Sequence, residues 1–192
     1  MTALALPRCP WCGNDPLYMA YHDQEWGRPQ HDDHKLFEML ILEGAQAGLS
    51  WITILRKREG YRRAFHGFDP QQVARMGEDD VERLMLDSSI VRNRLKINSA
   101  IRNARVFLQL QQEHGSFAQW LWAHTDGQSV VNHWQSLAEC PASTPLSDRI
   151  SKALKKAGMN FVGSTVIYAY LQATGVVNDH LLGCHLHPAY PH

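Results

Sequence analysis

A run of fourteen residues, from Leu42 to Leu55, most constrains how this chain can fold, because it carries a single charged group, Glu43, among largely apolar neighbours. An ionised carboxylate in apolar surroundings costs several kcal/mol unless a cation or a hydrogen-bond donor lies against it. Two interpretations follow. Glu43 either pairs with a buried arginine or caps backbone amides, or it is the polar group of a ligand pocket whose wall includes Trp51.

The sequence around this run predicts an all-α protein. Apolar residues recur at helical spacing in two segments, one from Asp32 to Glu43 and one from Ser50 towards Phe65, with Asp32 and Ser50 as the expected caps. Further helices are predicted after Asp69-Pro70, over 79–86, 90–110 and 117–122, from Ser147 to Gly158, and from Ser164 to Gly175. Residues 8–27 have no clean period and are expected to be irregular. Residues 124–146 are expected to form a surface connection, with a hint of a strand over 129–134.

Length and charge indicate one soluble domain. The chain has 192 residues, with 19 basic and 19 acidic side chains, and residues 51–125 carry 12 basic against 8 acidic ones. The middle of the chain can therefore offer a phosphate-binding face. We expect a flexible lead-in over 1–8, a single domain over 9–188 and a tail over 189–192. No signal peptide or membrane-spanning run is recognisable, which predicts a cytoplasmic protein.

Cysteines and histidines at the two ends of the sequence suggest a metal site. In a cytoplasmic protein four cysteines indicate metal ligands or free thiols rather than disulfides. Cys9 and His22, with His180 and Cys184, would supply the four ligands of a closed tetrahedral zinc site. Alternatives are open at this point, because Cys12 competes with Cys9, and His185 and His187 compete with His180. Such a site would join the chain ends and be structural.

A helical hairpin is predicted over residues 154–165, with glycines five residues apart at Gly158 and Gly163. An ordinary hairpin is one interpretation. The other is a DNA-backbone site, since amides at a helix N-terminus bind phosphate without reading the base sequence. The expected contributors are the side chains of Lys152, Lys155 and Lys156 and the backbone of Gly158, Val162, Gly163 and Ser164.

Aromatic residues cluster early in the chain, at Trp11, Tyr18, Tyr21, Trp26 and Trp51. Most buried aromatic residues belong to a hydrophobic core. Enzymes that act on a nucleobase, however, flip it out of the helix and hold it by stacking on aromatic side chains, which contributes roughly 1–3 kcal/mol of binding free energy per base.

These residues belong to linked motifs that resemble those of the 3-methyladenine DNA glycosylase I family. The motifs are Arg8-Cys9-x-Trp11, Asp15-Pro16-Leu17-Tyr18, Tyr21-His22-Asp23-x-Glu25-Trp26-Gly27, Leu36-Phe37-Glu38-Met39, Leu42-Glu43-Gly44-x-Gln46-Ala47-Gly48-Leu49-Ser50-Trp51-Ile52-Thr53, Phe161-Val162-Gly163 and Asn178-Asp179-His180-x-x-Gly183-Cys184. They occur in one order from Arg8 to about Pro188. Cys12, Gly13-Asn14 and the tail after Cys184 depart from the family pattern.

The resemblance implies a helix-hairpin-helix glycosylase fold, a helical bundle whose N- and C-terminal segments are joined by structural zinc. It places the metal ligands on Cys9, His22, His180 and Cys184, and the base pocket on Trp11, Tyr21, Glu43 and Trp51. The implied activity is hydrolysis of the N-glycosidic bond of 3-methyladenine in double-stranded alkylated DNA, with 3-methylguanine as a further candidate substrate. The free base is released and an abasic site remains. A monomer is expected.

The resemblance also suggests roles for two carboxylates. A 3-methyladenine nucleotide is cationic, so Glu43 can accept hydrogen bonds from the base and offset its charge. Asp179 either stabilises the sugar cation or orients the water, or it orients His180 instead, and we favour the role at His180. Two alternative functions are a DNA-binding module without catalysis, which has no use for Glu43, and a zinc hydrolase, which needs an open coordination position.

Overall fold

The computed structural model describes residues 6–191, and this part of the chain is mostly helical, as predicted. Its helices and strands are α1 (Pro16–Gln24), α2 (Asp33–Gln46), α3 (Trp51–Ala64), α4 (Pro70–Ala74), α5 (Glu78–Met85), α6 (Arg94–His114), α7 (Phe117–Trp122), β1 (Val130–Val131), α8 (Pro145–Ala157), α9 (Ser164–Ala173) and β2 (Val177–Asn178). Short 3-10 turns lie at Pro10–Cys12, His66–Phe68, Ala123–Thr125 and Leu137–Glu139. None of the helices in this part of the chain is long and apolar enough to cross a membrane.

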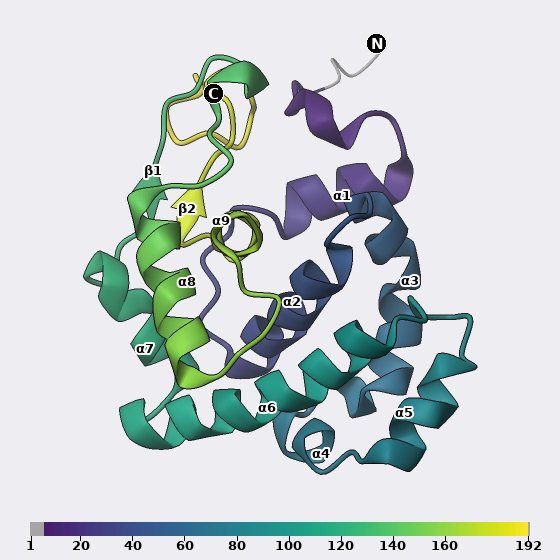
Figure 1. Ribbon diagram of the computed structural model, residues 1–192. Helices are drawn as coiled ribbons and strands as arrows, with labels where there is room; N and C mark the ends of the chain where they lie inside the picture. The colour runs from purple at the N-terminus through teal and green to yellow at the C-terminus, as the bar shows by residue number, and fades with distance from the viewer. Residues whose placement is uncertain (1–5, 192) are drawn as a thin grey trace.

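Helix α2 lies at the centre of the molecule (Figure 1), and residues 36–45 are all buried. It packs against α3, α6 and α9. Burial on every side explains why Glu38 and Glu43, two carboxylates of this helix, are almost inaccessible to solvent. The helix thereby sets the position of any site built on its last turn.

Local capping signals predicted several helix starts correctly. The Asp32 carboxylate accepts a hydrogen bond from the Lys35 amide at 3.0 Å and begins α2. The Asp69 carboxylate accepts one from Gln71 at 2.9 Å, and Pro70 is the first residue of α4. Side-chain caps depend on residues close in sequence, so they can be read without the tertiary structure.

Other boundaries were wrong by one to four residues. Helix α8 begins at Pro145 and not after Ser147, because Thr144 caps it and Ser147 completes a reciprocal capping box. Helix α6 begins at Arg94, capped by Asn93, and runs to His114. Helix α5 is displaced by one residue, to Glu78–Met85. Helix α3 does begin after Ser50, but the Ser50 hydroxyl pairs with Thr53 Oγ1 instead of a backbone amide.

The segment over residues 8–27, expected to be irregular, contains helix α1. Asp15 caps this helix by accepting hydrogen bonds from the amides of Leu17 and Tyr18, and Pro16 is its first residue. Tyr21 and His22 are adjacent and both are buried. A helix that is covered on more than one face has no amphipathic period, which is why the pattern did not predict it.

The two ends of the described chain lie together (Figure 1). The His185 amide donates to the Pro7 carbonyl at 2.9 Å, and β1 pairs in parallel with β2, Val130 opposite Val177. The predicted strand over 129–134 thus exists as two residues, with a partner that the sequence did not reveal. The expected lead-in and tail fall partly outside the described residues, at 1–5 and 192, and the domain limits stay predictions.

Candidate functional site

A pocket of about 210 Å³ opens to solvent where α1, α2, α3 and α9 converge. Its lining residues are Trp11, Tyr18, Tyr21, Trp26, Glu43, Gln46, Trp51, Leu137, Cys140, Ala169, Gln172 and Asp179. The four residues predicted for a base pocket, Trp11, Tyr21, Glu43 and Trp51, are all among them. Sequence positions up to 168 apart are brought to one cavity, from Trp11 to Asp179.

Glu43 is the most unusual group in the pocket. Its side chain is on the last turn of α2 and only 4% exposed. No hydrogen bond or ion pair to its carboxylate is found among residues 6–191. Burial raises the pKa of Glu43 to about 8. The first interpretation of Glu43, a carboxylate that pairs with a buried arginine or caps backbone amides, is therefore wrong for the described chain. Glu38 is the residue on α2 that makes such a pair, with Arg58 at 2.6 Å.

The aromatic walls also present unpaired polar atoms. The indole N–H groups of Trp11 and Trp51 and the Tyr21 hydroxyl are buried without a hydrogen-bond partner in the described chain. Burial, with the nearby Glu43 charge, raises the pKa of Tyr21 well above its ordinary value, so the phenol keeps its proton. Buried donors without partners cost free energy, and their clustering around one carboxylate indicates a polar ligand for this pocket.

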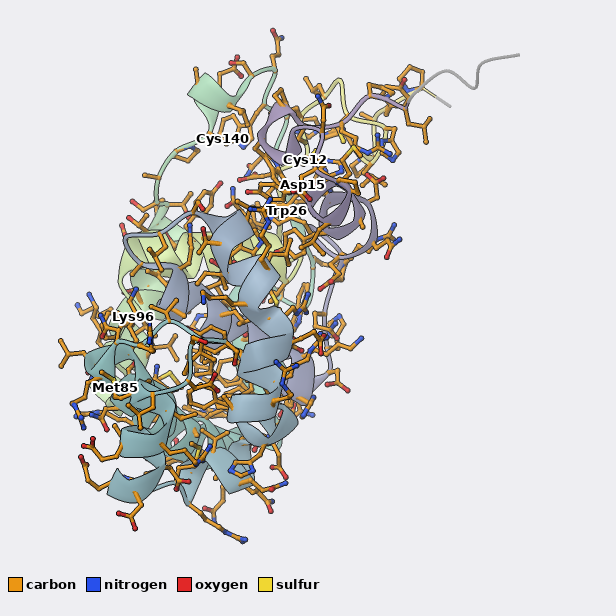
Figure 2. The ribbon with its side chains drawn as sticks, turned by 90° about the vertical axis from the view of Figure 1, so that its right-hand side faces the viewer. Cys12, Asp15, Trp26, Met85, Lys96 and Cys140 are labelled. Atoms are coloured by element: carbon orange, nitrogen blue, oxygen red, sulfur yellow. The ribbon has the colours of Figure 1, made fainter. Side chains whose placement is uncertain are left out.

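Several pocket residues were absent from the predicted site. Tyr18 and Trp26 belong to the aromatic group noted in the sequence, and ring centroids of 5.1 Å and 4.9 Å place each of them against Trp11. Leu137 and Cys140 come from residues 124–146, which were expected to be only a surface connection. Figure 2 shows Cys140 at the same end of the molecule as Trp26. No sequence signal links this connection to the pocket, because the contact exists only in the folded chain.

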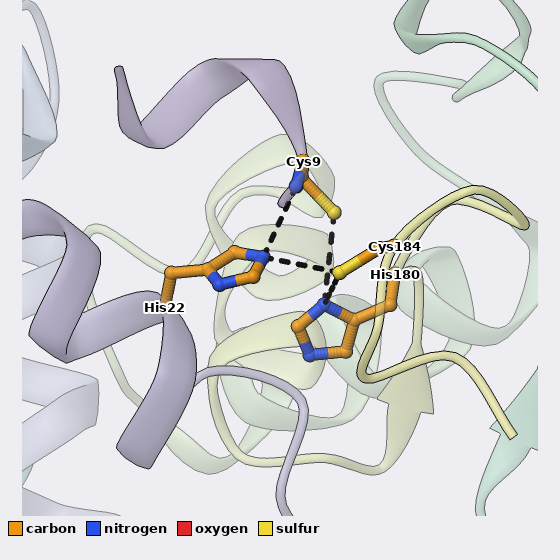
Figure 3. A group of neighbouring side chains, drawn as sticks. All are labelled: Cys9, His22, His180 and Cys184. Carbon is orange, nitrogen blue, oxygen red and sulfur yellow. Dashed lines mark hydrogen bonds between the residues drawn. The ribbon is translucent and has the colours of Figure 1, made fainter. Parts of the chain in front are cut away.

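Cys9, His22, His180 and Cys184 form a buried cluster (Figure 3). Their four ligand atoms lie within 4.8 Å of one another. Cys184 Sγ is 3.4 Å from His22 Nε2 and 3.5 Å from His180 Nδ1, and Cys9 Sγ is 3.6 Å from His180 Nδ1. Ligands about 2.0–2.3 Å from a central zinc ion would be separated by similar distances, so these residues fit a tetrahedral metal.

The surroundings of the cluster match those of a metal site. His22 Nδ1 lies 2.7 Å from the Asp23 carboxylate, and His180 Nε2 lies 3.0 Å from the Trp26 carbonyl, so each ring has a partner on its far nitrogen. Such partners orient metal-binding imidazoles. Hydrogen bonds from Cys9 and from the two histidines hold the pKa of the Cys184 thiol well below its ordinary value, which favours the metal-binding thiolate.

The competing ligands lie elsewhere. The Cys12 thiol donates to the Cys9 carbonyl at 3.2 Å and is not part of the cluster. His185 Nδ1 lies 2.8 Å from the Pro7 carbonyl, and His187 Nε2 lies 2.9 Å from the Asn132 carbonyl. The alternatives left by spacing alone are therefore decided in favour of Cys9 and His180.

Two aromatic residues connect the cluster with the pocket. Trp11 and Trp26 line the pocket and also pack against the buried residues Cys9 and Cys184. The Trp26 ring lies 4.8 Å from the His180 ring, nearly perpendicular to it. The cluster thus supports one wall of the pocket.

Asp179 does not orient His180, contrary to the role that we favoured from the sequence. The side chain is 2% exposed, lines the pocket and accepts four hydrogen bonds. The donors are Asn132 Nδ2 at 2.7 Å, Trp134 Nε1 at 2.9 Å, Gln172 Nε2 at 2.8 Å and the Tyr168 hydroxyl. Asp179 therefore ties α9 to the connection before α8.

Asp179→Asn is expected to destabilise the protein by about 1–3 kcal/mol without removing a metal bound at the cluster. An asparagine amide turns one acceptor into a donor that faces other donors, and leaves buried groups unpaired. Thermal unfolding and metal content of the purified variant would test this. Loss of the metal from folded Asp179→Asn would contradict it and restore the role of Asp179 at His180.

The α8–α9 hairpin has the predicted form. Lys152, Lys155 and Lys156 are exposed on α8. Gly158 ends that helix at φ +108°, and its amide donates to the Lys155 carbonyl at 3.0 Å, so its own N–H serves the turn. The amides of Val162, Gly163 and Ser164 have no hydrogen-bond partner within residues 6–191. They begin α9, where the helix dipole favours an anion.

Two curated relatives are similar over nearly their whole length. DNA-3-methyladenine glycosylase 1 of Escherichia coli (strain K12) is 54% identical over 183 residues, which are 95% of this chain and 98% of the relative. DNA-3-methyladenine glycosylase of Haemophilus influenzae is 45% identical over 177 residues, 92% of this chain and 96% of the relative.

Solved structures match equally well. A crystal structure of 3-methyladenine DNA glycosylase I has a TM-score of 0.93 at 54% identity, and covers 95% of this chain and 100% of that one. A variant of 3-methyladenine DNA glycosylase I in complex with 3-methyladenine has a TM-score of 0.90 at 35% identity, with 96% and 98% covered. The sequence model of the methyladenine glycosylase family matches residues 11–187. The chain belongs to the methyladenine glycosylase family.

Proposed function

We propose that this chain is a DNA glycosylase that hydrolyses the N-glycosidic bond of 3-methyladenine in alkylated DNA, releasing the base and leaving an abasic site. The relatives named above support this activity. The observation in this chain that carries it is Glu43, a buried carboxylate in an aromatic pocket, for which residues 6–191 offer no partner.

The pocket suits a cationic base better than an ordinary purine. Aromatic faces attract a delocalised cation by roughly 0.5–2 kcal/mol each, depending on how completely water is excluded. Glu43 can accept hydrogen bonds from the exocyclic amine, and hydrogen bonds to a charged group are about twice as strong as neutral ones. The donors on Trp11, Tyr21 and Trp51, which no other described residue pairs with, can then bind ring nitrogens of the base. A neutral adenine offers Glu43 no charge to offset the cost of its burial.

The chemistry needs little proton transfer to the leaving group. A water oxygen forms a bond to C1′, and the electron pair of the breaking C1′–N bond neutralises the cationic base as it leaves. The water proton passes to solvent. Glu43 acts by binding the base where this bond can break, and we assign it as the residue that contacts the reacting base.

The hairpin supplies a site for the DNA backbone. We propose that the side chains of Lys152, Lys155 and Lys156 bind phosphates of double-stranded DNA, together with the amides of Val162, Gly163 and Ser164, which have no partner within the described chain. Gly158 contributes by closing the turn. Contacts of this type hold the duplex without reading its sequence.

We further propose that the Cys/His cluster binds one zinc ion in a structural role. Its four protein ligands leave no open coordination position for catalysis. Thiolate ligands and a DNA substrate together favour a reducing compartment that contains DNA, and we place the protein in the cytoplasm, as a monomer. Whether 3-methylguanine is also excised depends on the shape of the pocket, and the base-release assay described below tests it.

The decisive experiment is chromatographic detection of bases released from methylated DNA by the purified protein, with a heat-denatured control. We expect release of 3-methyladenine with 7-methylguanine left in the DNA, and a 3-methylguanine peak would add that base to the substrates. No release by folded, metal-replete protein would overturn the proposal. A DNA-binding module without catalysis would then be the better account.

A further inference from the structure

One face of helix α6 holds two parts of the proposed site at once. Lys96 Nζ donates to the carbonyls of Ala45 and Ala47, at 2.8 Å and 2.5 Å, and so binds the C-terminal end of α2 just after Glu43. Figure 2 shows Lys96 on this helix. Two turns further along α6, Asn103 holds the α8–α9 hairpin. Spacings of three, four and seven residues place side chains on the same helix face.

Asn103 binds both polar groups of one residue of the hairpin. Its Nδ2 donates to the Asn160 carbonyl at 2.8 Å, and its Oδ1 accepts from the Asn160 amide at 2.9 Å. The Asn103 side chain is only 4% exposed, so it cannot contact DNA. Its neighbour Arg102 adds a bond from Nε to the Gly158 carbonyl at 2.5 Å.

The residue after Asn160 explains why the hairpin needs this support. Phe161 has φ +53°, the left-handed region that a bulky residue rarely adopts without being held there by its surroundings. Phe161 also lies against Gly44, since a Cβ placed on Gly44 would be 3.5 Å from Phe161 Cβ. The hairpin loop therefore rests on α2 beside Glu43, and three elements meet there.

We propose that Asn103 is a positioning residue, which fixes the phosphate-binding hairpin in register with the base pocket through Asn160 and Phe161. Lys96 holds the C-terminal end of α2, next to the pocket, through its bonds to the Ala45 and Ala47 carbonyls. The inference rests on the proposed function, because register matters only if the base and the DNA backbone are bound together. A flipped base reaches Glu43 from a duplex whose phosphates lie on the hairpin, so a shift between the two sites weakens excision even when each site is intact.

The test compares two substitutions on α6. Asn103→Leu removes both bonds to Asn160, and Asn103→Asp keeps the acceptor for the Asn160 amide but loses the donor. Arg105→Met is the matched control, because Arg105 Nε also donates from α6 to a backbone carbonyl, that of Ala74 in α4, at 3.0 Å. Each variant is assayed below its Tm for kcat and KM on duplex DNA containing 3-methyladenine, for duplex affinity, and for affinity towards free 3-methyladenine.

We expect Asn103→Leu to lower duplex affinity and kcat/KM by tenfold or more, with free-base affinity within twofold of the wild type. Asn103→Asp should show a smaller loss of the same kind, and it replaces the leucine variant if that one fails to fold. Arg105→Met should change neither duplex affinity nor kcat/KM. The proposal is overturned if folded Asn103→Leu or Asn103→Asp excises at the wild-type rate, or if free-base affinity falls in parallel with excision.

Failure of the proposed function would look different. In that case the wild-type protein itself would release no 3-methyladenine. The comparison of duplex affinity between Asn103→Leu and Arg105→Met would still show whether α6 positions the hairpin.

Discussion

Glu43→Gln is expected to lower kcat/KM for 3-methyladenine excision by about 100-fold and to weaken binding of the base, while the folded protein stays at least as stable. A hydrogen bond to a charged group contributes about 1.5–3 kcal/mol, and about 1.4 kcal/mol corresponds to a factor of ten. The glutamine keeps the shape of the side chain and removes its charge. It also removes a buried carboxylate that has no partner among the described residues, so no stability is lost.

Glu38→Gln is the matched control for this prediction. Glu38 is on the same helix and equally buried, but its carboxylate pairs with Arg58 at 2.6 Å and with Arg62 at 2.9 Å. Removing that charge should lower the free energy of unfolding, because Arg58 loses a buried partner. Base affinity of the folded variant should be unchanged. Wild-type excision and base affinity in Glu43→Gln would show that Glu43 does not recognise the base.

The pH dependence gives an independent check on Glu43. Folding raises its pKa from an ordinary value of 4.5 to about 8. A carboxyl raised in this way stabilises the folded state most below its unfolded pKa, and the contribution is lost as the pH rises through the folded pKa. From about pH 5 to pH 8, Tm of the wild type should therefore fall relative to Tm of Glu43→Gln.

The excision rate constant kcat/KM should rise with pH, whereas the relative Tm falls. If the cationic base binds ionised Glu43, kcat/KM of the wild type rises with pH until about pH 8, since this constant reports the free enzyme. In Glu43→Gln the rise is expected to disappear. Equal profiles for the two proteins would contradict the assignment.

Cys184→Ser is expected to prevent the cluster from binding the zinc ion that we propose for it, to lower Tm by about 10 °C or more, and to abolish most excision. A structural zinc site contributes folding free energy directly, and about 1 kcal/mol shifts Tm by 2–4 °C in a protein of this size. Loss of the metal is expected to disturb the pocket, because Trp11 and Trp26 pack against the Cys/His cluster and also line the pocket. Metal analysis, thermal unfolding and the base-release assay measure the three effects.

Cys12→Ser provides the control for this second prediction. Cys12 is also buried in the N-terminal segment, but its thiol bonds to the Cys9 carbonyl and lies outside the cluster. This variant should keep its metal and most of its activity. If Cys184→Ser were as stable and as active as Cys12→Ser, the cluster would not be a structural metal site.

Features that depend on near neighbours or on linked motifs could be predicted from the amino-acid sequence alone. Caps such as Asp32 and Asp69 could be identified because their hydrogen bonds reach only two or three residues along the chain. The family could be identified because its motifs occur in one order, and the resemblance pointed to the four residues that the structure brings together in the Cys/His cluster. The unusual position of Glu43 was evident because a single charge in an apolar run is a local fact.

Which of the possible partners are in contact became clear only from the folded chain. Spacing could not choose between Cys9 and Cys12, and it suggested His180 as a partner for Asp179, whose four hydrogen bonds in fact come from α9 and the connection before α8. It also gave no sign that Cys140 lines the pocket or that Asn103 holds Asn160. These contacts join residues tens of positions apart, and they are set by how the helices pack, which no local pattern records.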